Sequence, residues 1–260
     1  DICRLCVQIF KAHADDCFVP SSDEQKIAFG QQFELLNSLL KIFHNFTDAS
    51  EDFCLALSRV ECLYRDCASP LLTGWVSRHV SLSQCRLLVN SVLGFVGNQF
   101  FKNNSDIYYT LSALELVEPV MPYLSSPVLN IKVLALFLIA FALDESQAEL
   151  YESATEVMQF LVDSLKEATK SDNRTCYVSL LDADYQTYHA IELAQCINRL
   201  ALNEVNKKLL VGFGLLPVLK TMLDGEAEDE IAAALDILFT LSFRLVSWKG
   251  SSQEDRHHFS

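Results

Sequence analysis

Apolar residues recur at intervals of three and four along nearly the whole chain, which is the pattern of amphipathic helices. This spacing predicts helices at 1–13, 23–46, 50–66, 69–80, 82–101, 105–125, 127–143, 147–170, 185–203, 205–212, 214–224 and 226–247. No alternating run flanked by hairpin turns predicts a strand. The one longer connection, 171–184, is expected to be a loop, in which Asp182 and Asp184 cap the entry of the next helix. The pattern places the chain in the all-α class.

The composition agrees with long helices and short connections. The chain of 260 residues holds only 8 glycines and 6 prolines, which disfavours a turn-rich β-sandwich. Its longest apolar run, 133–143, is shorter than the roughly 20 residues that a membrane span requires, and nothing at the start resembles a signal peptide. We therefore expect one helical domain over 1–249, followed by a flexible polar tail over 250–260.

The charge of the chain excludes several classes of partner. A formal net charge of −14 disfavours binding to the phosphate backbone of nucleic acids. The sequence also lacks the basic cluster that would hold it to an anionic membrane. The nine cysteines sit mostly within apolar periodic segments, so we expect reduced, buried thiols and a cytoplasmic location.

One group of cysteines and a histidine allows two interpretations. Cys3, Cys6, His13 and Cys17 would supply the four ligands of a zinc site. Their spacing matches no zinc-finger pattern, however, and Cys3 and Cys6 are three residues apart, as on one face of a helix. The helix face is the favoured interpretation, and we expect neither a metal nor a cofactor.

The sequence contains an internal repeat. The segment 189–203 aligns with 230–244 at an offset of 41 residues, a period typical of three-helix armadillo units. At 203–219 an Asn and a short helix are followed by Gly, an apolar residue, Leu, Pro and a second helix. The residues that match this armadillo pattern are Asn203, Asn206, Val211, Gly214, Leu216, Pro217 and Leu219.

The chain thus resembles the armadillo family, and HEAT repeats, with two helices per unit, are the near alternative. The resemblance implies an armadillo-like α-solenoid, a right-handed superhelix in which stacked repeats bury faces that none could bury alone. The third helices of the repeats, which line the concave face in that family, are expected at about 32–47, 82–98, 127–143, 185–203 and 226–244.

The resemblance also points to candidate binding positions. Importin-like members carry a Trp and, four residues later, an Asn on each third helix. The equivalent pairs here are Lys41/Asn45, Asn90/Gly94, Leu136/Ala140, Gln195/Arg199 and Asp236/Thr240. Because the Trp is absent throughout, an import receptor is not expected, and Leu136 is interpreted as a buried residue. The candidate partner-binding residues are Lys41, Asn45, Asn90, Gln195, Arg199, Asp236 and Thr240. Arg199 is the most informative, since a guanidinium can grip a carboxylate or phosphate with two hydrogen bonds.

No catalytic motif accompanies these positions. The sequence has no phosphate-binding loop, no H-E-x-x-H and no G-x-S-x-G motif, and His13, His44, His79 and His189 show no paired metal spacing. The leading hypothesis is therefore a non-catalytic scaffold that binds a peptide or a protein domain on its concave face.

An enzyme in its own right would require a convergent acid/base cluster that the sequence does not show, and two further hypotheses remain open. The degenerate repeats and the acidic surface are loosely similar to the helical-repeat regions of multidomain innate-immunity proteins of the TIR type. That similarity implies an autoregulatory domain of a larger signalling protein, which senses a nucleotide or another anionic metabolite. In addition, the uncapped ends of a helical array expose apolar surface, which predicts self-association through those ends.

Overall fold

The computed structural model describes residues 2–14, 23–78, 80, 82–102, 104–112, 114–181 and 184–243. Helices dominate these residues. In the first half they are α1 (Ile2–Ala14), α2 (Asp23–Ala49), α3 (Glu51–Ser58), α4 (Glu61–Leu63), the π-helical η1 (Tyr64–Ala68), α5 (Ser69–Thr73), α6 (Trp75–Arg78), α7 (Ser83–Phe101) and α8 (Ser105–Ser112). In the second half they are α9 (Val117–Val120), the 3₁₀-helical η2 (Met121–Ser125), α10 (Leu129–Ala142), α11 (Glu145–Leu150), α12 (Thr155–Ala168), α13 (Ala190–Leu200), α14 (Glu204–Gly212), α15 (Leu215–Leu223) and α16 (Glu228–Ser242).

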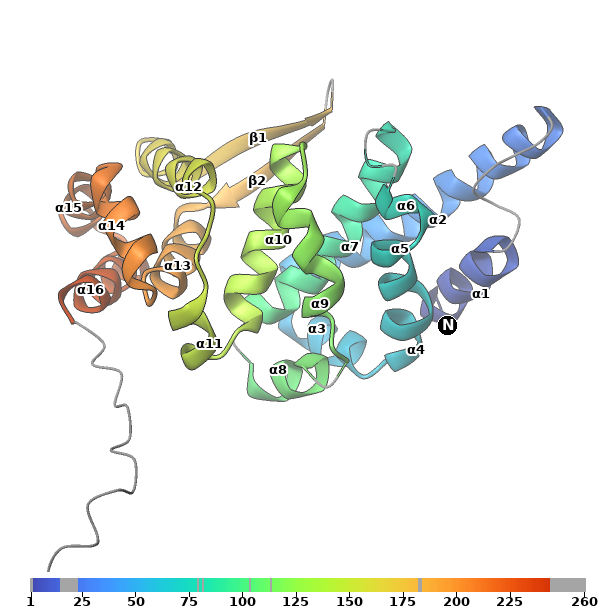
Figure 1. Cartoon of the computed structure of the whole chain (residues 1–260), viewed down its shortest axis with the longest axis horizontal. Helices are drawn as coiled ribbons and strands as arrows, with labels where there is room; N and C mark the ends of the chain where they lie inside the picture. The colour runs from blue at the N-terminus through green and yellow to red at the C-terminus, as the bar shows by residue number, and fades with distance from the viewer. Residues whose placement is uncertain are drawn as a thin grey trace, which may run out of the picture.

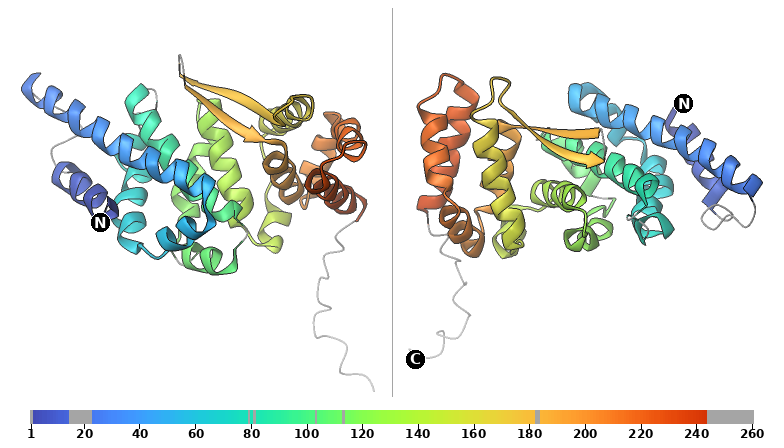
Figure 2. Two further views of the ribbon diagram at one scale, coloured as in Figure 1. Left: turned by 180° about the vertical axis from the view of Figure 1, so that it is seen from behind. Right: turned by 90° about the horizontal axis from the view of Figure 1, so that it is seen from above.

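The helices are stacked along one long axis, from α1 and α2 at one end to α14, α15 and α16 at the other (Figures 1 and 2). Five of them, α2, α7, α10, α13 and α16, form an inner row in which each helix packs against the next. These five helices correspond to the third helices expected from the sequence. The prediction of an all-α solenoid of stacked helices is confirmed.

The centre of the array is the part least accessible to solvent. Helix α10 is apolar on all sides and is buried almost all round, as expected for a helix enclosed by neighbours. Leu136 and Ala140 are both inaccessible to solvent, so the interpretation of Leu136 as a core residue is confirmed. In the described part of the chain no helix is both long and apolar enough to cross a lipid bilayer.

The asparagines of the armadillo-like segment join neighbouring repeats. The Asn203 side chain accepts hydrogen bonds from the backbone of Val205 at 2.9 Å and of Asn206 at 3.1 Å, which caps α14. Its amide nitrogen donates to the carbonyl of Glu149 at 2.8 Å, in the preceding repeat. The Asn206 amide nitrogen likewise donates to the carbonyl of Tyr151 at 2.7 Å. These side chains satisfy backbone groups that a helix start and an extended segment would otherwise leave unpaired.

The turn between α14 and α15 also follows the sequence. Gly214 adopts a φ of 86°, in the left-handed region where glycine carries no steric penalty. Pro217 lies in the first turn of α15, where its missing N–H removes no helical hydrogen bond.

The prediction of a loop at 171–184 was wrong. The segment that includes the expected loop 171–184 contains β1 (Thr175–Leu181), which pairs antiparallel with β2 (Asp184–His189). Helix α13 therefore begins at Ala190 rather than at 185, and its start is capped by His189 and Glu192. Asp184 belongs to β2, five residues before the N-cap of α13 at His189, whereas Asp182 lies outside the described residues. Both strands contain Thr and Tyr, and β1 also contains Val; these residues fit a half-buried pleated surface better than a helix.

Several predicted helices are divided. The expected helix 105–125 becomes α8, α9 and η2, with Glu115 at a φ of 52° between the first two. The expected helix 147–170 becomes α11 and α12, and α11 starts at a capping box formed by Asp144 and Gln147. The expected helices 50–66 and 69–80 are also each broken into shorter pieces. Helix α16 ends at Ser242, and the rest of its predicted length and the tail 250–260 lie outside the described residues.

Candidate functional site

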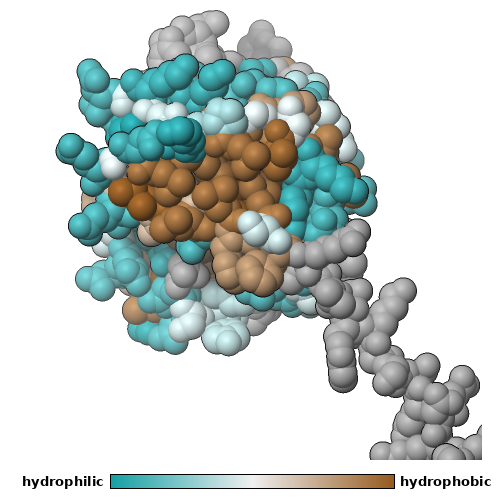
Figure 3. Space-filling model, turned by 90° about the vertical axis from the view of Figure 1, so that its left-hand side faces the viewer, coloured by the Kyte–Doolittle hydropathy of each residue, from teal (hydrophilic) through white to brown (hydrophobic). Residues whose placement is uncertain are grey.

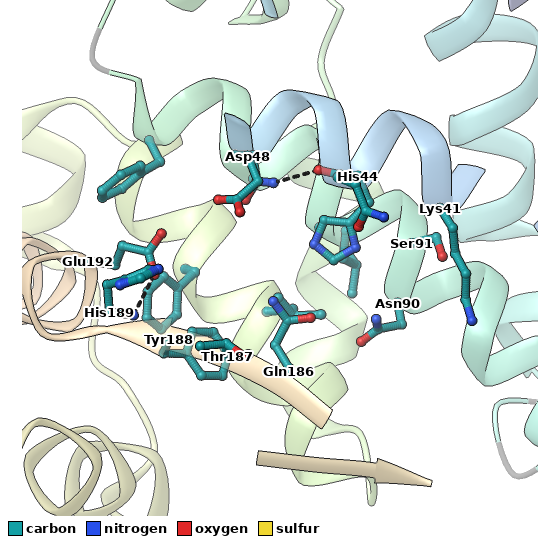
Figure 4. A pocket seen from close by; sticks show the side chains of 18 of the residues that line it. Lys41, His44, Asp48, Asn90, Ser91, Gln186, Thr187, Tyr188, His189 and Glu192 are labelled. Carbon is teal, nitrogen blue, oxygen red and sulfur yellow. Dashed lines mark hydrogen bonds between the residues drawn. The ribbon is translucent and has the colours of Figure 1, made fainter. Parts of the chain in front are cut away.

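A pocket of about 380 Å³ opens on the inner row where the hairpin meets the helices (Figure 4). Helix α2 contributes Lys41, His44, Asn45 and Asp48, and α7 contributes Asn90, Ser91 and Asn98 among others. Strand β2 contributes its last four residues, Gln186 to His189, on the side of the pocket opposite α2. The floor includes Leu134, Phe137 and Phe141 of α10. Polar groups from three elements thus surround an apolar base, as in many ligand sites.

A buried hydrogen-bond network fixes the strand against the floor. The Tyr188 hydroxyl donates to the Asn130 side-chain oxygen at 3.2 Å, and the Asn130 amide nitrogen donates to the side-chain oxygen of Asn90. The Tyr188 ring stacks on Phe137 with 5.2 Å between ring centroids. Because Tyr188, Asn130 and Asn90 are almost fully buried, loss of any one member would leave a polar group unpaired. The network fixes the position of β2 relative to α10 and α7.

The carboxylates of Asp48 and Glu192 both lie at one end of the pocket. Burial raises the pKa of Glu192 on α13 above its ordinary value; Lys102 offsets part of this rise, and the charge of the exposed Asp48 adds to it. The Glu192 side chain accepts a hydrogen bond from the backbone N–H of His189 at 2.8 Å, which acts in the opposite direction. This bond is a helix cap, so it accounts for Glu192 without a catalytic role.

His44 presents a neutral imidazole to the pocket. Burial lowers its pKa below the ordinary value of 6.5, and the nearby Asp48 offsets only part of that effect. Figure 4 shows the His44 ring directed into the pocket from α2. The site therefore combines a neutral imidazole, side-chain amides, the Lys41 ammonium group and two carboxylates above an aromatic base.

The sequence-predicted binding residues separate into three groups. Lys41, Asn45 and Asn90 line the pocket. Gln195 and Asp236 line a second, smaller hollow of about 290 Å³ between α13 and α16. Arg199 and Thr240 line neither of these two hollows.

The two remaining residues bond to neighbouring helices. The Arg199 Nε donates to the carbonyl of Ala140 at 3.2 Å, and its guanidinium also bonds to the carbonyl of Leu143. These carbonyls lie at the end of α10, where helical partners are lacking and a positive charge is favourable. The Thr240 hydroxyl donates to the Asn198 side-chain oxygen at 2.7 Å, which joins α16 to α13. Arg199 thus holds α13 against the end of α10.

Several pocket residues were missed by reasoning from sequence. His44 and His189 line the same pocket although 145 positions separate them, and Asp48 and Glu192 interact across it. Lys41, His44, Asn45 and Asp48 recur at three- and four-residue spacing, which places them on one face of α2. That polar face on one of the expected third helices was the available signal.

The cysteines that the structure describes form no second centre. Within the described ranges, no group of His, Cys, Asp and Glu side chains is arranged to hold a metal ion. Cys6 is buried on α1, and burial raises the pKa of its thiol to about 12. The zinc alternative remains a prediction, because Cys17 and the side chain of His13 lie outside the described residues.

Two other surface features lie away from the pocket. A hollow of about 730 Å³ lies beside α5, α6 and α9, with Tyr123 and several prolines in its lining. At the end of the array formed by α14, α15 and α16, an apolar patch is bordered by polar residues (Figure 3). Exposed apolar residues on these three helices include Val205, Val211, Leu216, Leu235 and Phe239.

Comparison with known proteins gives a limited result. No protein-family model matches the chain, and no curated protein matches its sequence. Among solved structures, the designed armadillo repeat protein YIII(Dq.V1)4CPAF in complex with the peptide (KR)4 is 15% identical, with a TM-score of 0.36 over 91% of this chain and 98% of its own. The designed armadillo repeat protein YIII(Dq)4CqI is 12% identical, with a TM-score of 0.33 over 93% of this chain and 100% of its own. At these TM-scores the assignment of the fold rests on the helix packing described above.

Proposed function

We propose that the chain is a non-catalytic protein-interaction scaffold that binds an extended segment of a partner protein in the pocket between α2, α7, α10 and β2. The observation that carries this proposal is the pocket itself, in which Lys41, Asn45 and Asn90 meet an aromatic floor on the inner row. Stacked helical arrays use such inner surfaces for binding because many repeats contribute to one continuous face. The hollow with Gln195 and Asp236 extends this surface along α13 and α16.

The charge of the pocket favours a protein segment over an anionic metabolite as the ligand. Asp48 and Glu192 both line that end of the pocket, so an anionic metabolite there would meet two carboxylates, offset in part by the charge of Lys102. The sensing of a nucleotide by a TIR-type protein is therefore the weaker hypothesis. A segment with neutral or basic side chains suits the site better, and a cytoplasmic location remains part of the proposal.

The test is a selection from a phage-displayed library of random 12-residue peptides on the immobilised chain. We expect enriched peptides that bind with micromolar or tighter dissociation constants, about −8 kcal/mol. Asp48→Lys should weaken binding by about tenfold or more, because it reverses a charge at the pocket. Asp163→Lys is the matched control, since Asp163 is also an exposed carboxylate on a helix but lies on α12, outside the pocket.

Two results would contradict the proposal. One is a library that yields no specific binder after repeated rounds of selection. The other is a set of peptides whose affinities fall equally with Asp48→Lys and Asp163→Lys, because a binding site elsewhere would then be responding to net charge alone.

A further inference from the structure

The outer edge of β2 has backbone groups that point away from β1. The pairing places Thr175 opposite His189 and Tyr177 opposite Thr187. The N–H of Ala190 donates to the carbonyl of Arg174 at 2.9 Å, so Arg174 and Ala190 form a hydrogen-bonded pair. Hydrogen-bonded and non-hydrogen-bonded pairs alternate along an antiparallel ladder. The N–H and C=O of Thr187 therefore point to the edge of the hairpin that β1 does not occupy.

His189 supports this assignment independently. Its position in the ladder, two residues after Thr187, directs its N–H to the same outer edge. That N–H donates to the Glu192 side chain on α13 rather than to β1. The available edge therefore stops at His189 and runs back through Thr187 to Tyr185, whose backbone has the same phase.

This edge borders the pocket. Gln186, Thr187, Tyr188 and His189 all line it, although successive side chains of a strand point to opposite faces. A cavity on one face of a strand would meet only alternate residues, whereas a cavity along its edge meets consecutive ones. Figure 4 shows these four residues along the pocket. Thr187 is exposed, and among the residues that the structure describes none bonds to its outward N–H or C=O.

An open edge strand beside a groove is a template for another strand. We propose that the partner segment binds as a third strand of the hairpin, pairing with the backbone of Tyr185 and Thr187 inside the pocket. This inference rests on the proposed function and specifies how the segment is held. Backbone hydrogen bonds then supply affinity that does not depend on sequence, and side-chain contacts supply the specificity.

The pocket also specifies the side chains of that strand. On the face that the strand turns toward α10, Leu134, Phe137 and Phe141 favour apolar residues. At the end near α13, the carboxylates of Asp48 and Glu192 both line the pocket (Figure 4), so a positive charge is favourable beside them. The segment is therefore an extended one, with alternate apolar residues and a basic residue at the end that meets these carboxylates.

A pair of proline substitutions tests the strand pairing. The probe is a 12-residue peptide selected from the displayed library, titrated against each variant. Thr187→Pro removes only the outward N–H, so it should weaken binding by about tenfold or more while the pairing with β1 is kept. Tyr177→Pro is the matched control, because Tyr177 is directly opposite and its N–H points to the outer edge of β1. Tyr177→Pro should change the affinity by less than about twofold.

A second measurement does not depend on how the variants fold. Each backbone nitrogen of the selected peptide is methylated in turn, and binding to the unaltered protein is measured. Strand pairing predicts losses at every second position within the bound segment, because alternate N–H groups face β2.

The outcomes separate this inference from the proposed function. If Asp48→Lys abolishes binding while Thr187→Pro does not and the methylation pattern has no period of two, the groove binds the peptide in another way and strand pairing is wrong. If the library yields no binder, the proposed function fails and strand pairing fails with it.

Discussion

The imidazole of His44 on α2 lies directly against Gly94 on α7. A Cβ atom built at Gly94 would be 2.4 Å from His44 ring atoms, well inside van der Waals contact. The absence of a side chain at Gly94 thus lets two helices of the inner row approach and lets His44 lie at the base of the pocket. This contact links the packing of the helices to the shape of the candidate site.

The first prediction concerns this contact. Gly94→Ala should destabilise the fold by about 1–3 kcal/mol through overpacking, although alanine in a helix normally gains about 1 kcal/mol over glycine. In a His44→Ala background the same substitution should no longer be destabilising. Chemical denaturation of the four proteins of the cycle measures the coupling.

Gly97 on the same helix is the matched control. A Cβ at Gly97 would meet only the Cβ of Leu138, at 4.0 Å. Gly97→Ala should therefore be neutral or stabilising by up to about 1 kcal/mol. Equal destabilisation by Gly94→Ala with and without the His44 ring would show that the contact is not the cause.

The second prediction is a dependence of stability on pH. The pKa of His44 is lower in the folded than in the unfolded chain, so the unfolded chain binds more protons as the pH falls. His44 therefore lowers the free energy of unfolding progressively below about pH 6.5, the unfolded value. Relative to His44→Gln, the unaltered protein should lose stability between pH 7.5 and 5.5, as measured by denaturation at each pH.

Glu192 should make stability depend on pH in the opposite direction. Its pKa is raised in the folded chain, so its charged form costs stability above the unfolded pKa of about 4.3. Relative to Glu192→Gln, the unaltered protein should lose stability as the pH rises from 4 to 7. If both groups changed the free energy of unfolding in the same direction with pH, burial could not be the main cause of both pKa shifts.

The third prediction separates support of the fold from binding at Arg199. Its guanidinium bonds to the carbonyls of Ala140 and Leu143, so Arg199→Ala should destabilise the protein by about 1–3 kcal/mol. Arg65→Ala, which breaks an exposed pair with Glu61, should change stability by less than about 1 kcal/mol. At a temperature where both variants are folded, the selected peptide should bind each as it binds the unaltered protein. If Arg199→Ala lost peptide binding while its stability was unchanged, Arg199 would be a binding residue and this prediction would be wrong.

The fourth prediction concerns the apolar end of the array. Leu235 and Phe239 on α16 are 54% and 64% exposed, and we expect this end to associate with a second copy. Sedimentation velocity should show a concentration-dependent increase in mass, which Phe239→Glu removes. Tyr109→Glu is the control, because Tyr109 is 72% exposed on α8, away from that end. A sedimentation coefficient that does not change with concentration would refute self-association through this end.

Helical periodicity predicted the stacked array because most of the chain buries one face of a helix at a time. It missed the hairpin, in which Tyr177 is exposed whereas Cys176 and Tyr188 are buried. Over so short a segment, the period of two is interrupted by a register shift between Ser179 and Leu181. The β-branched and aromatic residues were the better guide, since they fit a pleated surface.

The site was only partly accessible from sequence, for a related reason. Lys41, Asn45 and Asn90 followed from their place on inner helices, and the structure brings them to one pocket. The contribution of β2 required the hairpin. The engagement of Arg199 with the end of α10 depended on a contact between helices that no local pattern encodes.

Hydrogen exchange, measured by mass spectrometry on the chain alone and saturated with a selected peptide, tests the binding site most directly. With the peptide bound, we expect slower exchange at 184–189 and at the segments of α2 and α7 that line the pocket. We expect no change in α5 and α6. Protection confined to α14, α15 and α16, or to the hollow beside α5 and α9, would contradict binding in the pocket on the inner row.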